Sequence, residues 1–576
     1  MPTWEVRRVA GLLQRLTRIF QRRKYAALTR RLGRPGVHPD GQPGFIVIQI
    51  DGLAYDHLRQ AMEAGYLPYL SRMIATGALR LAQWHSGLPS TTPAFQGALM
   101  FGNRYDVPGF RWYEKERGLA IVAKRPDQVR SLQARLKGQR TGILVGGSSY
   151  VNMFDGDADL ALFTLSAFAP QRFFGSVRGA GLVLLFLLSP FRVLRVLWLT
   201  VRDYLRALRW RLSALVRRSV IKPYDLFSPL MVAAVNALFT EVQTFGVLVD
   251  IYRGVPSIYT NYNTYDEVAH LRGPTHRDSL AVLRDLDRRI RQIDRMRRRG
   301  TNRAYDLYVL SDHGNAPSVP FSWETGRSLG QFIAAQLGSE VSLDEVMSRP
   351  GHAVAKARYL LDEMDGLEKR APQTARRVAS VLRHYVRSRV PTDPEVEEYD
   401  LERREDVVVR VSGPLAHVYF NVAPRPLELI EVALLYPRLL DQLVAVEPIG
   451  LVIGRAEERA VVLGTGGGST VIRHGQVEVA PPNPLAAYGD TAEVARQIHQ
   501  LSFFPHSGDL ILLGAVRAQG RVVTFEEQLG SHGGIGGVQE QAFIAWPPAV
   551  DLTAVRDPLD LHRRFQERYL DGGKRS

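Results

Sequence analysis

Short apolar runs that lead directly into acidic residues occur at two distant places in the chain. Residues 45–50 (FIVIQI) end at Asp51, and residues 307–310 (LYVL) lead into Asp312 and His313. Unbroken apolar runs are typical of parallel strands that are buried on both faces. Since functional groups in such sheets lie at the carboxyl ends of the strands, we expect these acids to share one edge of an α/β sheet.

Other segments extend this pattern. Residues 141–147 and 257–262 are further strand candidates between helical stretches, and residues 321–405 are charged and predicted to form a helical insertion or cap. Strand patterns return from Val407 onward. The glycine run at 464–469 predicts a hairpin turn, because no helix follows it as a phosphate loop requires.

Two segments combine apolar residues with many arginines. Residues 4–32 place apolar side chains at spacings of three and four, which predicts an amphipathic helix with an arginine-rich face. Residues 179–191 are uncharged but shorter than the about 20 residues that span a bilayer. After a break at Pro190, leucines and arginines recur at helical spacing up to Leu215. We interpret this second segment as a helix in a membrane interface.

The net charge of +16 supports this interpretation because it is concentrated in those segments. Residues 1–34 carry +9 and residues 170–222 carry +10, which leaves about −3 for the rest. Packing against the main body of the protein or against another subunit is the main alternative. Nucleic-acid binding is a weaker one: Trp198, Tyr204 and Trp210 fit base stacking, but they fit a membrane-interface belt equally well. Residues 1–34 lack a secretory signal pattern. We therefore expect the protein to bind an anionic membrane surface from the cytoplasmic side.

The chain contains no cysteine, which narrows the chemistry it can perform. Disulfides, thiolate metal sites and a cysteine nucleophile are excluded, so a metal ion would be held by histidine, carboxylate or hydroxyl groups. An apolar fraction of 45% in 576 residues indicates a globular protein, either one large α/β domain with insertions or three domains.

Five separated stretches contain the residue types that a two-metal phosphohydrolase needs. Taken singly, each has an ordinary interpretation, such as a helix cap, a turn or a buried histidine. Together they supply three carboxylates, three imidazoles and a hydroxyl: Asp51, Thr92, Asp266 and His270, Asp312 and His313, and His532.

In this order the motifs resemble the nucleotide pyrophosphatase/phosphodiesterase branch of the alkaline phosphatase superfamily. The matching features are the strand ending in Asp-Gly, Pro89-Ser90-Thr91-Thr92 followed by Gly102, Asp266 and His270 followed by Gly273-Pro274, Ser-Asp-His-Gly at 311–314, and His532-Gly533. The resemblance covers about residues 44–550, without 160–225 and 321–405.

The resemblance implies an α/β fold in which helices sandwich a mostly parallel central sheet, with helical insertions. The expected organisation is an N-terminal helix and linker (1–43), a catalytic domain in three parts (44–159, 226–320 and 406–550), a membrane-associated insertion (160–225), a cap (321–405) and a tail (551–576).

The resemblance also implies roles for the site residues. One divalent ion would be held by Asp51, Thr92, Asp312 and His313, and a second by Asp266, His270 and His532. This set of ligands suits zinc, with manganese as a substitute. Thr92 would be the nucleophile and form a covalent phospho-enzyme, which water activated at the second metal would release.

The sequence departs from the family next to the nucleophile. Phe95 stands where members have an asparagine that binds a phosphoryl oxygen. Either Gln96 or Asn263 takes over this role, or the metals and the backbone alone bind the phosphoryl oxygen. A shift that makes Thr91 the nucleophile is possible but spoils the spacing to Gly102.

These observations predict a membrane-associated phosphoester hydrolase that prefers diesters, with a lipid-linked or nucleotide substrate. A noncatalytic membrane-surface binder that keeps the fold is an alternative, although the presence of all seven ligand positions argues against it. A phosphomonoesterase or a phosphomutase is another, although the phosphomutase serine and carbohydrate-binding insertion are not evident.

Overall fold

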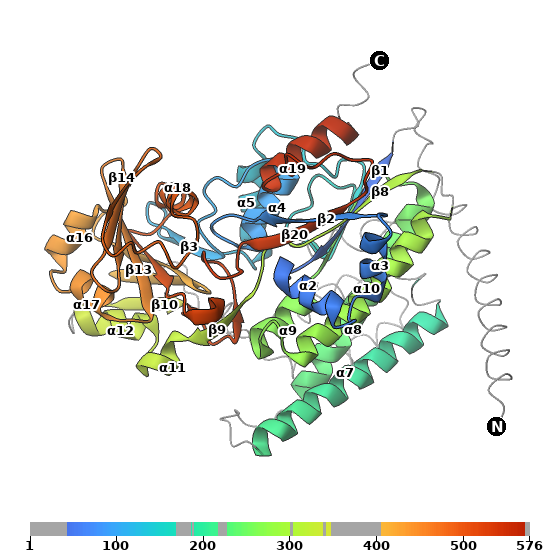
Figure 1. The fold of residues 1–576 in the computed structure, drawn as a ribbon, viewed down its shortest axis with the longest axis horizontal. Coiled ribbons are helices and arrows are strands. Elements are labelled where there is room, and N and C mark those ends of the chain that lie inside the picture. Colours follow the sequence, from blue (N-terminus) through green and yellow to red (C-terminus); the bar gives the residue numbers. More distant parts are fainter. Residues whose placement is uncertain are drawn as a thin grey trace, which may run out of the picture.

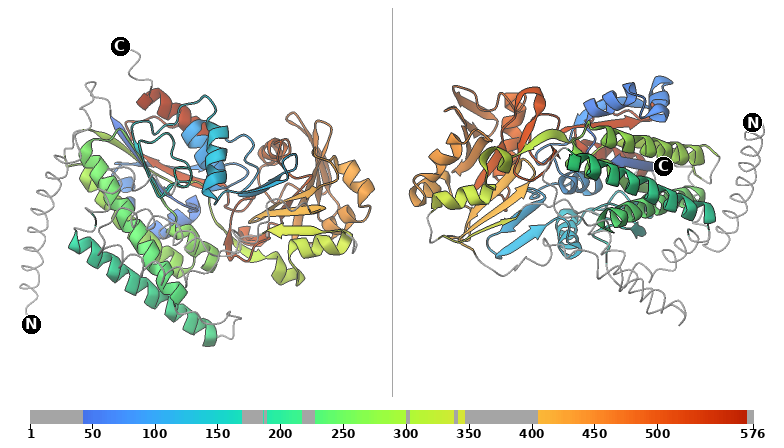
Figure 2. Two further views of the ribbon diagram at one scale, coloured as in Figure 1. Left: turned by 180° about the vertical axis from the view of Figure 1, so that it is seen from behind. Right: turned by 90° about the horizontal axis from the view of Figure 1, so that it is seen from below.

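The computed structural model describes residues 43–168, 186, 189–216, 227–299, 303–337, 341–346 and 405–570. The amphipathic helix predicted at 4–32, most of the apolar run at 179–191 and most of the predicted cap lie outside these residues. The described chain forms two neighbouring parts, each built on its own sheet (Figures 1 and 2).

The first part contains a seven-stranded sheet that is parallel except for one strand. Its order is β2 (Arg80–His85), β20 (Gln541–Trp546), β8 (Tyr305–Leu310), β1 (Gly44–Ile50), β7 (Ser257–Tyr262), β5 (Ser148–Tyr150) and β6 (Leu160–Leu162). Strand β1 pairs in parallel with both β7 and β8, and β20 is antiparallel to both of its neighbours. This mostly parallel central sheet is the predicted fold class.

Helices cover both faces of this sheet (Figure 1). One face packs on α2 (Tyr55–Glu63), α3 (Pro68–Ala75), α8 (Phe227–Arg253), α9 (Thr264–Arg272) and α10 (Arg277–Arg297). The other packs on α4 (Thr92–Phe101), α5 (Pro126–Lys137) and α19 (Pro558–Phe565).

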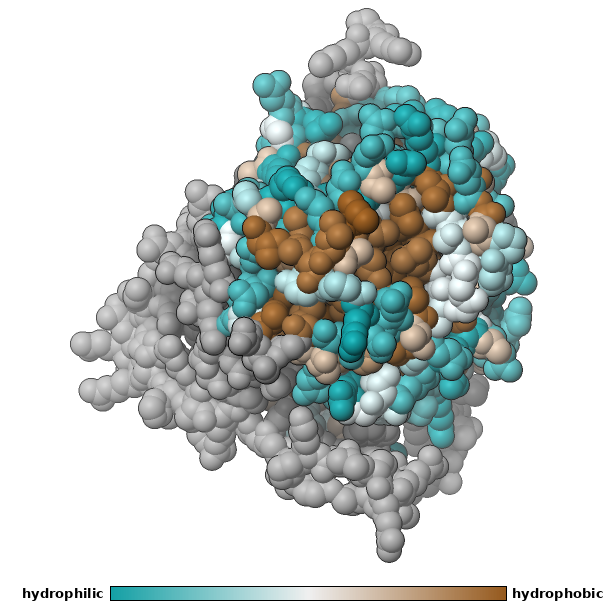
Figure 3. Space-filling view, turned by 90° about the vertical axis from the view of Figure 1, so that its left-hand side faces the viewer, coloured by the Kyte–Doolittle hydropathy of each residue, from teal (hydrophilic) through white to brown (hydrophobic). Residues whose placement is uncertain are grey.

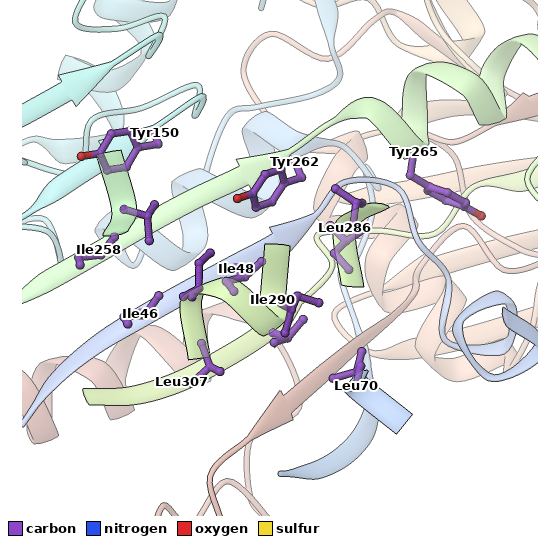
Figure 4. Close-up of a cluster of buried hydrophobic side chains, with 14 of the residues drawn as sticks. Ile46, Ile48, Leu70, Tyr150, Ile258, Tyr262, Tyr265, Leu286, Ile290 and Leu307 are labelled. Carbon is purple, nitrogen blue, oxygen red and sulfur yellow. The ribbon is translucent and has the colours of Figure 1, made fainter. Parts of the chain in front are cut away.

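Strand β1 shows why the apolar run at 45–50 forms a central strand. Alternate side chains point to opposite faces, so Ile46 and Ile48 join one core while Phe45 and Val47 join the other. Figure 4 shows Ile46 and Ile48 among side chains from β7, β8, α3 and α10. Every residue of β1 is buried, which requires an apolar sequence without alternation.

The second part is built on an eight-stranded sheet, which the sequence analysis did not separate from the first. Its order is β10 (Leu343–Val346), β11 (Val407–Ser412), β12 (Leu415–Phe420), β17 (Leu510–Gly514), β13 (Ile449–Ala456), β14 (Arg459–Gly464), β15 (Ser469–Arg473) and β16 (Gln476–Ala480). It packs on α11 (Phe321–Thr325), α12 (Leu329–Leu337), α16 (Leu429–Leu435), α17 (Leu439–Ala445) and α18 (Thr491–Ser502). The predicted hairpin turn at 464–469 joins β14 to β15.

Two smaller sheets complete the described strands. Strand β9 (Ala316–Pro320) lies between β18 (Val522–Thr524) and β19 (Gly530–Ser531), and β3 (Arg111–Glu114) pairs with β4 (Leu119–Val122). Through β18 and β19 the chain returns from the second sheet to the first, and His532 follows β19 directly.

Two predicted elements differ in the structure. The strand expected at 141–147 is a turn with one isolated bridge at Val145, and the strand β5 begins only at Ser148, because Gly146 has a positive φ of 72°. The described start of the predicted helical cap also contains a strand: β10 pairs with β11 at the edge of the second sheet.

The helix expected after Pro190 is present as α7 (Pro190–Val216), and Pro190 is its first residue. Proline fits the first turn of a helix because its missing N–H has no partner there in any case. Helix α7 packs against α8 on the outside of the first part (Figure 1).

Gly102 ends α4 in a left-handed conformation (φ 63°, ψ 29°), and a Cβ at this position would lie 2.6 Å from Cδ2 of His562. Gly326 ends α11 in a similar conformation (φ 72°, ψ 3°), but a Cβ there would meet nothing within 4 Å.

We predict that Gly326→Ala lowers the free energy of unfolding by about 1–2 kcal/mol, which is the conformational cost alone. Gly102→Ala should lower it more, because its Cβ would also collide with His562. Denaturant unfolding of both variants measures this, and equal losses would contradict the proposed packing against His562.

Candidate active site

The seven residues singled out from the sequence converge on one edge of the seven-stranded sheet. Asp51 follows β1, and Asp312 and His313 follow β8, its parallel neighbour. Helix α9, which contains Asp266 and His270, follows β7 on the other side of β1. Since these three strands run in parallel, their carboxyl ends deliver the side chains to a shared edge, as the pattern of acids after apolar runs predicts.

Thr92 is the first residue of α4 and lies in the centre of this group. Its Oγ1 donates a hydrogen bond to Oδ2 of Asp312 at 2.8 Å and lies 3.3 Å from Nε2 of His313. Thr92 is half-buried, whereas Thr91 is only 1% exposed and its Oγ1 has no hydrogen-bond partner among the described residues. The geometry therefore places Thr92, and not Thr91, in the site.

The potential ligand atoms form two overlapping groups. In the first, Asp51, Asp312 and His313 each offer an atom within 4.8 Å of the others. In the second, Asp266, His313 and His532 do the same. His313 thus lies between the two groups, and its ring stacks on that of His532 with centroids 3.7 Å apart.

His270 joins the second group through Asp266. Its Nε2 lies 3.0 Å from Oδ2 of Asp266, while Nε2 of His532 lies 3.7 Å from Oδ1 of the same carboxylate. The division of ligands implied by the family resemblance therefore corresponds to two adjacent clusters in space, with His313 close to both.

The three histidines are oriented in the same way by the backbone. Nδ1 of His270 lies 2.8 Å from the carbonyl oxygen of Gly530, that of His532 lies 2.9 Å from the oxygen of Ser90, and that of His313 lies 3.1 Å from the oxygen of Gly314. A carbonyl oxygen accepts a hydrogen bond from a protonated Nδ1, which leaves Nε2 as the unprotonated nitrogen of a neutral ring. This arrangement prepares each Nε2 to bind a cation.

Two asparagines that the sequence analysis did not assign to this role support the carboxylates. Nδ2 of Asn261 donates to Oδ2 of Asp51, and Nδ2 of Asn315 donates to Oδ1 of Asp266, both at 2.9 Å. Asn315 directly follows the Ser-Asp-His-Gly motif, which is the one sequence signal that could have identified it. Asn261 is within a strand pattern and gives no such signal.

Gly52 brings the backbone close to the same carboxylates. Its N–H donates to Oδ1 of Asp312 at 3.2 Å, and its φ is 70°. A Cβ at this position would lie 2.3 Å from Oδ1 of Asp266. The Asp-Gly pair after β1 is thus required by the close approach of two acidic side chains.

The electrostatics of the site fit bound cations. Burial raises the pKa of Asp51, and the charges of Asp312 and Asp266 raise it further. Burial also raises the pKa of Asp312 to about 6, against the opposing effect of the hydrogen bond from Thr92. Close buried carboxylates disfavour one another's ionised forms, and positive charge between them relieves this repulsion.

The histidines complement this arrangement. Burial lowers the pKa of His313 to about 4 and that of His532 to about 3, so both rings are neutral near pH 7. Burial would raise the pKa of Asp266, but its interaction with His270 outweighs this effect and lowers the pKa. Burial by itself would lower the pKa of His270, but Asp266 raises it more, so a cation at this pair would displace the proton that the two side chains share. Neutral imidazoles and ionised carboxylates are the forms that bind divalent cations, so the residues present fit two metal ions.

The residues proposed from the sequence as substrate ligands lie in different environments. Phe95 is buried against Trp84, with ring centroids 5.5 Å apart. Gln96 is fully buried and its amide contacts Gln49, Asn152 and the N–H of Met153.

Since its partners use the whole amide, Gln96 is not placed to bind substrate, and this prediction needs correction. Phe95 likewise belongs to the core. Asn263 lies between β7 and α9 at the same edge as the ligands and is half-buried, so it stays a candidate.

A third group of possible ligands, Glu114, Glu116 and His506, lies outside this site. Glu114 pairs with Arg135 at 2.9 Å and Arg117 at 2.7 Å. The arginines already neutralise this acidic group, so it is a salt-bridge network.

Comparison with known proteins gives a family match within the chain. Residues 241–425 match the family of type I phosphodiesterases / nucleotide pyrophosphatases. This span contains Asp266, His270, Asp312 and His313, whereas Asp51, Thr92 and His532 lie outside it and meet these four in the structure. No curated protein matches the sequence.

Solved structures similar to the chain include two hydrolases. Phosphonoacetate hydrolase from Sinorhizobium meliloti 1021, in complex with phosphonoformate, is 14% identical with a TM-score of 0.41, and the alignment covers 92% of this chain and 96% of that one. Murine ectonucleotide pyrophosphatase / phosphodiesterase 5, as an inactive variant with AMP, is 11% identical with a TM-score of 0.43, covering 92% and 95%.

The family match confirms the resemblance that the motif order predicted. The chain is similar to the type I phosphodiesterase / nucleotide pyrophosphatase family over residues 241–425.

Proposed function

We propose that the protein is a two-metal phosphoester hydrolase that uses Thr92 as its nucleophile. The observation on which this proposal depends is the position of Oγ1 of Thr92, 2.8 Å from Asp312 and 3.3 Å from His313 at the first turn of a helix. A hydroxyl in contact with two potential metal ligands is the arrangement that an activated threonine needs.

The two ligand clusters would each hold one divalent ion. Asp51, Thr92, Asp312 and His313 would hold the first, and Asp266, His270 and His532 the second, with zinc favoured by the mixture of carboxylate and imidazole and manganese as a substitute. When bound, such ions lower the pKa of a coordinated hydroxyl and stabilise negative charge on phosphoryl oxygens.

The residues of the chain define the course of the reaction. Oγ1 of Thr92 forms a bond to phosphorus as the bond between phosphorus and the leaving oxygen breaks, and the hydroxyl proton is directed at Oδ2 of Asp312. Water then breaks the bond between Oγ1 and phosphorus and regenerates the threonine. Two in-line displacements leave the configuration at phosphorus unchanged.

The first turn of α4 offers a binding site for a phosphoryl oxygen in place of the missing asparagine. The N–H groups of a first helical turn have no partner within the helix and lie at its positive end. In α4 these include the N–H groups of Thr92 and Ala94, next to the nucleophile. Helix N-termini bind phosphate groups for this reason, so the backbone can supply what the Phe95 side chain cannot.

The preference for diesters over monoesters follows from the family match and remains part of the proposal. The substrate is proposed to be a lipid-linked phosphoester at an anionic membrane, on the cytoplasmic side, with a nucleotide as the alternative. The apolar and basic character of α7 supports the lipid-linked choice.

We predict that Thr92→Ala lowers the rate of hydrolysis of bis-p-nitrophenyl phosphate by several orders of magnitude in the presence of zinc or manganese, because it removes the nucleophile. The matched control is Thr91→Ala, the neighbouring threonine whose hydroxyl lies in the core. An equal loss in both variants, or full activity of Thr92→Ala, would contradict the proposed role. A comparison with p-nitrophenyl phosphate measures the preference for diesters.

Asn315→Ala is expected to weaken activation by manganese about 10- to 100-fold, because groups that orient a metal ligand have effects of this size. The expected change is in the manganese concentration that gives half-maximal activity, since Asp266 loses the hydrogen bond that fixes it. Asn483→Ala, which removes a hydrogen bond to Thr491 in the second part, is the control. An unchanged manganese dependence of Asn315→Ala would exclude this positioning role.

Metal affinity is predicted to depend on pH through Asp312. The pKa of this carboxyl is raised to about 6 in the metal-free protein, so it is largely protonated below that pH and must lose a proton to bind a cation. Calorimetric titration with manganese should therefore show weaker binding at about pH 5 than at about pH 7.5. Equal affinity at both values would show that Asp312 is not a ligand whose proton the metal displaces.

A further inference from the structure

Helix α7 is the outermost helix on its side of the part of the chain that the structure describes. It packs against α8, which in turn contributes Phe239, Val242 and Phe245 to the core beside the seven-stranded sheet. Figure 1 and the right-hand view of Figure 2 agree in placing α7 outside α8.

Helix α8 is the one helix in the described part of the chain that is long and apolar enough to cross a membrane. However, 72% of its most apolar window is buried inside the protein. Helix α8 is thus a core helix, and the surface available to a membrane on this side belongs to α7.

Three arginines in the first half of α7 point toward the protein: Arg192, Arg195 and Arg202. Arg192 and Arg195 both pair with Glu241 of α8, at 3.5 Å and 2.9 Å, and this carboxylate is fully buried. Arg202 pairs with Asp285 of α10 at 2.6 Å. These ion pairs fix the rotation of α7 about its axis.

The same rotation leaves an apolar stripe facing outward. The stripe consists of six side chains that are about half exposed, at spacings that place them on one side of the helix: Phe191, Leu194, Leu197, Trp198, Val201 and Leu205. A surface helix ordinarily buries its apolar side and exposes its charges. Helix α7 has the opposite arrangement. An exposed apolar side of this kind is stable when an apolar partner or medium covers it.

The charges around the stripe indicate what covers it. Arg206 is 40% exposed and Arg209 is exposed, one turn beyond Leu205, and residues 170–222 carry a net charge of +10. A second copy of the same helix would bring like charges together. An anionic bilayer offers both the apolar layer and the opposite charge.

A second apolar surface serves as a contrast. Val422, Ile430, Leu434 and Leu435 are exposed at the end of the second part, where Figure 3 shows apolar side chains gathered on the surface. In and beside the helices there, the acids Glu428, Glu431, Asp441 and Glu447 outnumber the bases Arg425 and Arg438. This acidic surrounding does not match an anionic bilayer.

We propose that the α7 stripe docks the protein onto an anionic lipid bilayer, with α7 lying in the plane of the interface. The salt bridges to Glu241 and Asp285 hold the apolar side chains outward in advance, so docking requires no rotation of the helix. Arg206 and Arg209 contact lipid head groups at the end of the stripe. The inference does not depend on the proposed hydrolase activity.

The absence of cysteine allows a direct test on the full chain. A single cysteine introduced by Leu194→Cys is labelled with the environment-sensitive fluorophore NBD, and Leu434→Cys on α16 is the matched control, since both leucines are well exposed. Each labelled protein is mixed with vesicles of phosphatidylcholine alone, or of phosphatidylcholine and phosphatidylglycerol in equal amounts.

The expected result is a blue shift and a severalfold rise in NBD emission for Leu194→Cys with the anionic vesicles only, and no change for Leu434→Cys. A spin label in the lipid chains should quench the probe at position 194. Unchanged emission from that probe, while the protein sediments with the vesicles, would overturn the proposal, because another segment would then bind the lipid. A probe at 194 that is already shielded without vesicles would also overturn it, since a second copy or another part of the chain would cover the stripe.

A second variant controls for the label. Replacing Leu194, Trp198 and Val201 together by glutamine should reduce co-sedimentation with anionic vesicles at least tenfold, while replacing Ile430, Leu434 and Leu435 by glutamine should not. Unchanged hydrolysis of bis-p-nitrophenyl phosphate shows that each variant is folded; if the wild type has no such activity, an unchanged unfolding temperature shows it. Equal binding of both variants and the wild type would refute docking through α7.

Discussion

The convergence of three carboxylates at the edge of one parallel sheet is the constraint on which the site depends. Asp51, Asp266 and Asp312 follow or lie close to the ends of β1, β7 and β8, and their mutual repulsion and burial raise the pKa values of Asp51 and Asp312. Such a group is unfavourable without compensating positive charge. Three histidines present Nε2 to these acids, two asparagines fix the carboxylates, and Thr92 lies between them. Together these groups form possible binding sites for cations.

The site also explains why the chain leaves the first sheet and returns to it. The second sheet is inserted between β8 and β20, and the returning segment passes through β18 and β19 before it delivers His532. Its Nδ1 then contacts the carbonyl oxygen of Ser90, two residues before Thr92, the proposed nucleophile. Residues far apart in the sequence therefore close the site together, and its geometry requires that both sheets be folded.

Sequence patterns predicted the parts of the structure that depend on local chemistry. The buried runs before Asp51 and Asp312 gave the central strands, and the order of motifs gave the seven residues that meet at the sheet edge. The second sheet was not separated from the first, since its central strands β11, β12 and β17 are buried along their whole length like β1, and pairing partners are not encoded locally. The 141–147 segment has apolar residues like a strand, but its glycines adopt a turn.

The roles of Gln96, Asn261 and Asn315 depend on side-chain packing, which the sequence alone does not show. Gln96 was a reasonable candidate from its place near Thr92, yet it lies on the core side of α4, where buried polar groups require partners of their own. The arrangement of α7 was predicted in type but not in orientation. The spacing of leucines and arginines predicts a helix, and only the buried Glu241 shows that Arg192 and Arg195 point inward.

Two metal ions are proposed to occupy the two adjacent ligand clusters, and anomalous X-ray scattering from a crystal grown with zinc would locate them. We expect two anomalous peaks, one among Asp51, Thr92, Asp312 and His313 and one among Asp266, His270 and His532. A single peak, or peaks away from these side chains, would contradict this proposal.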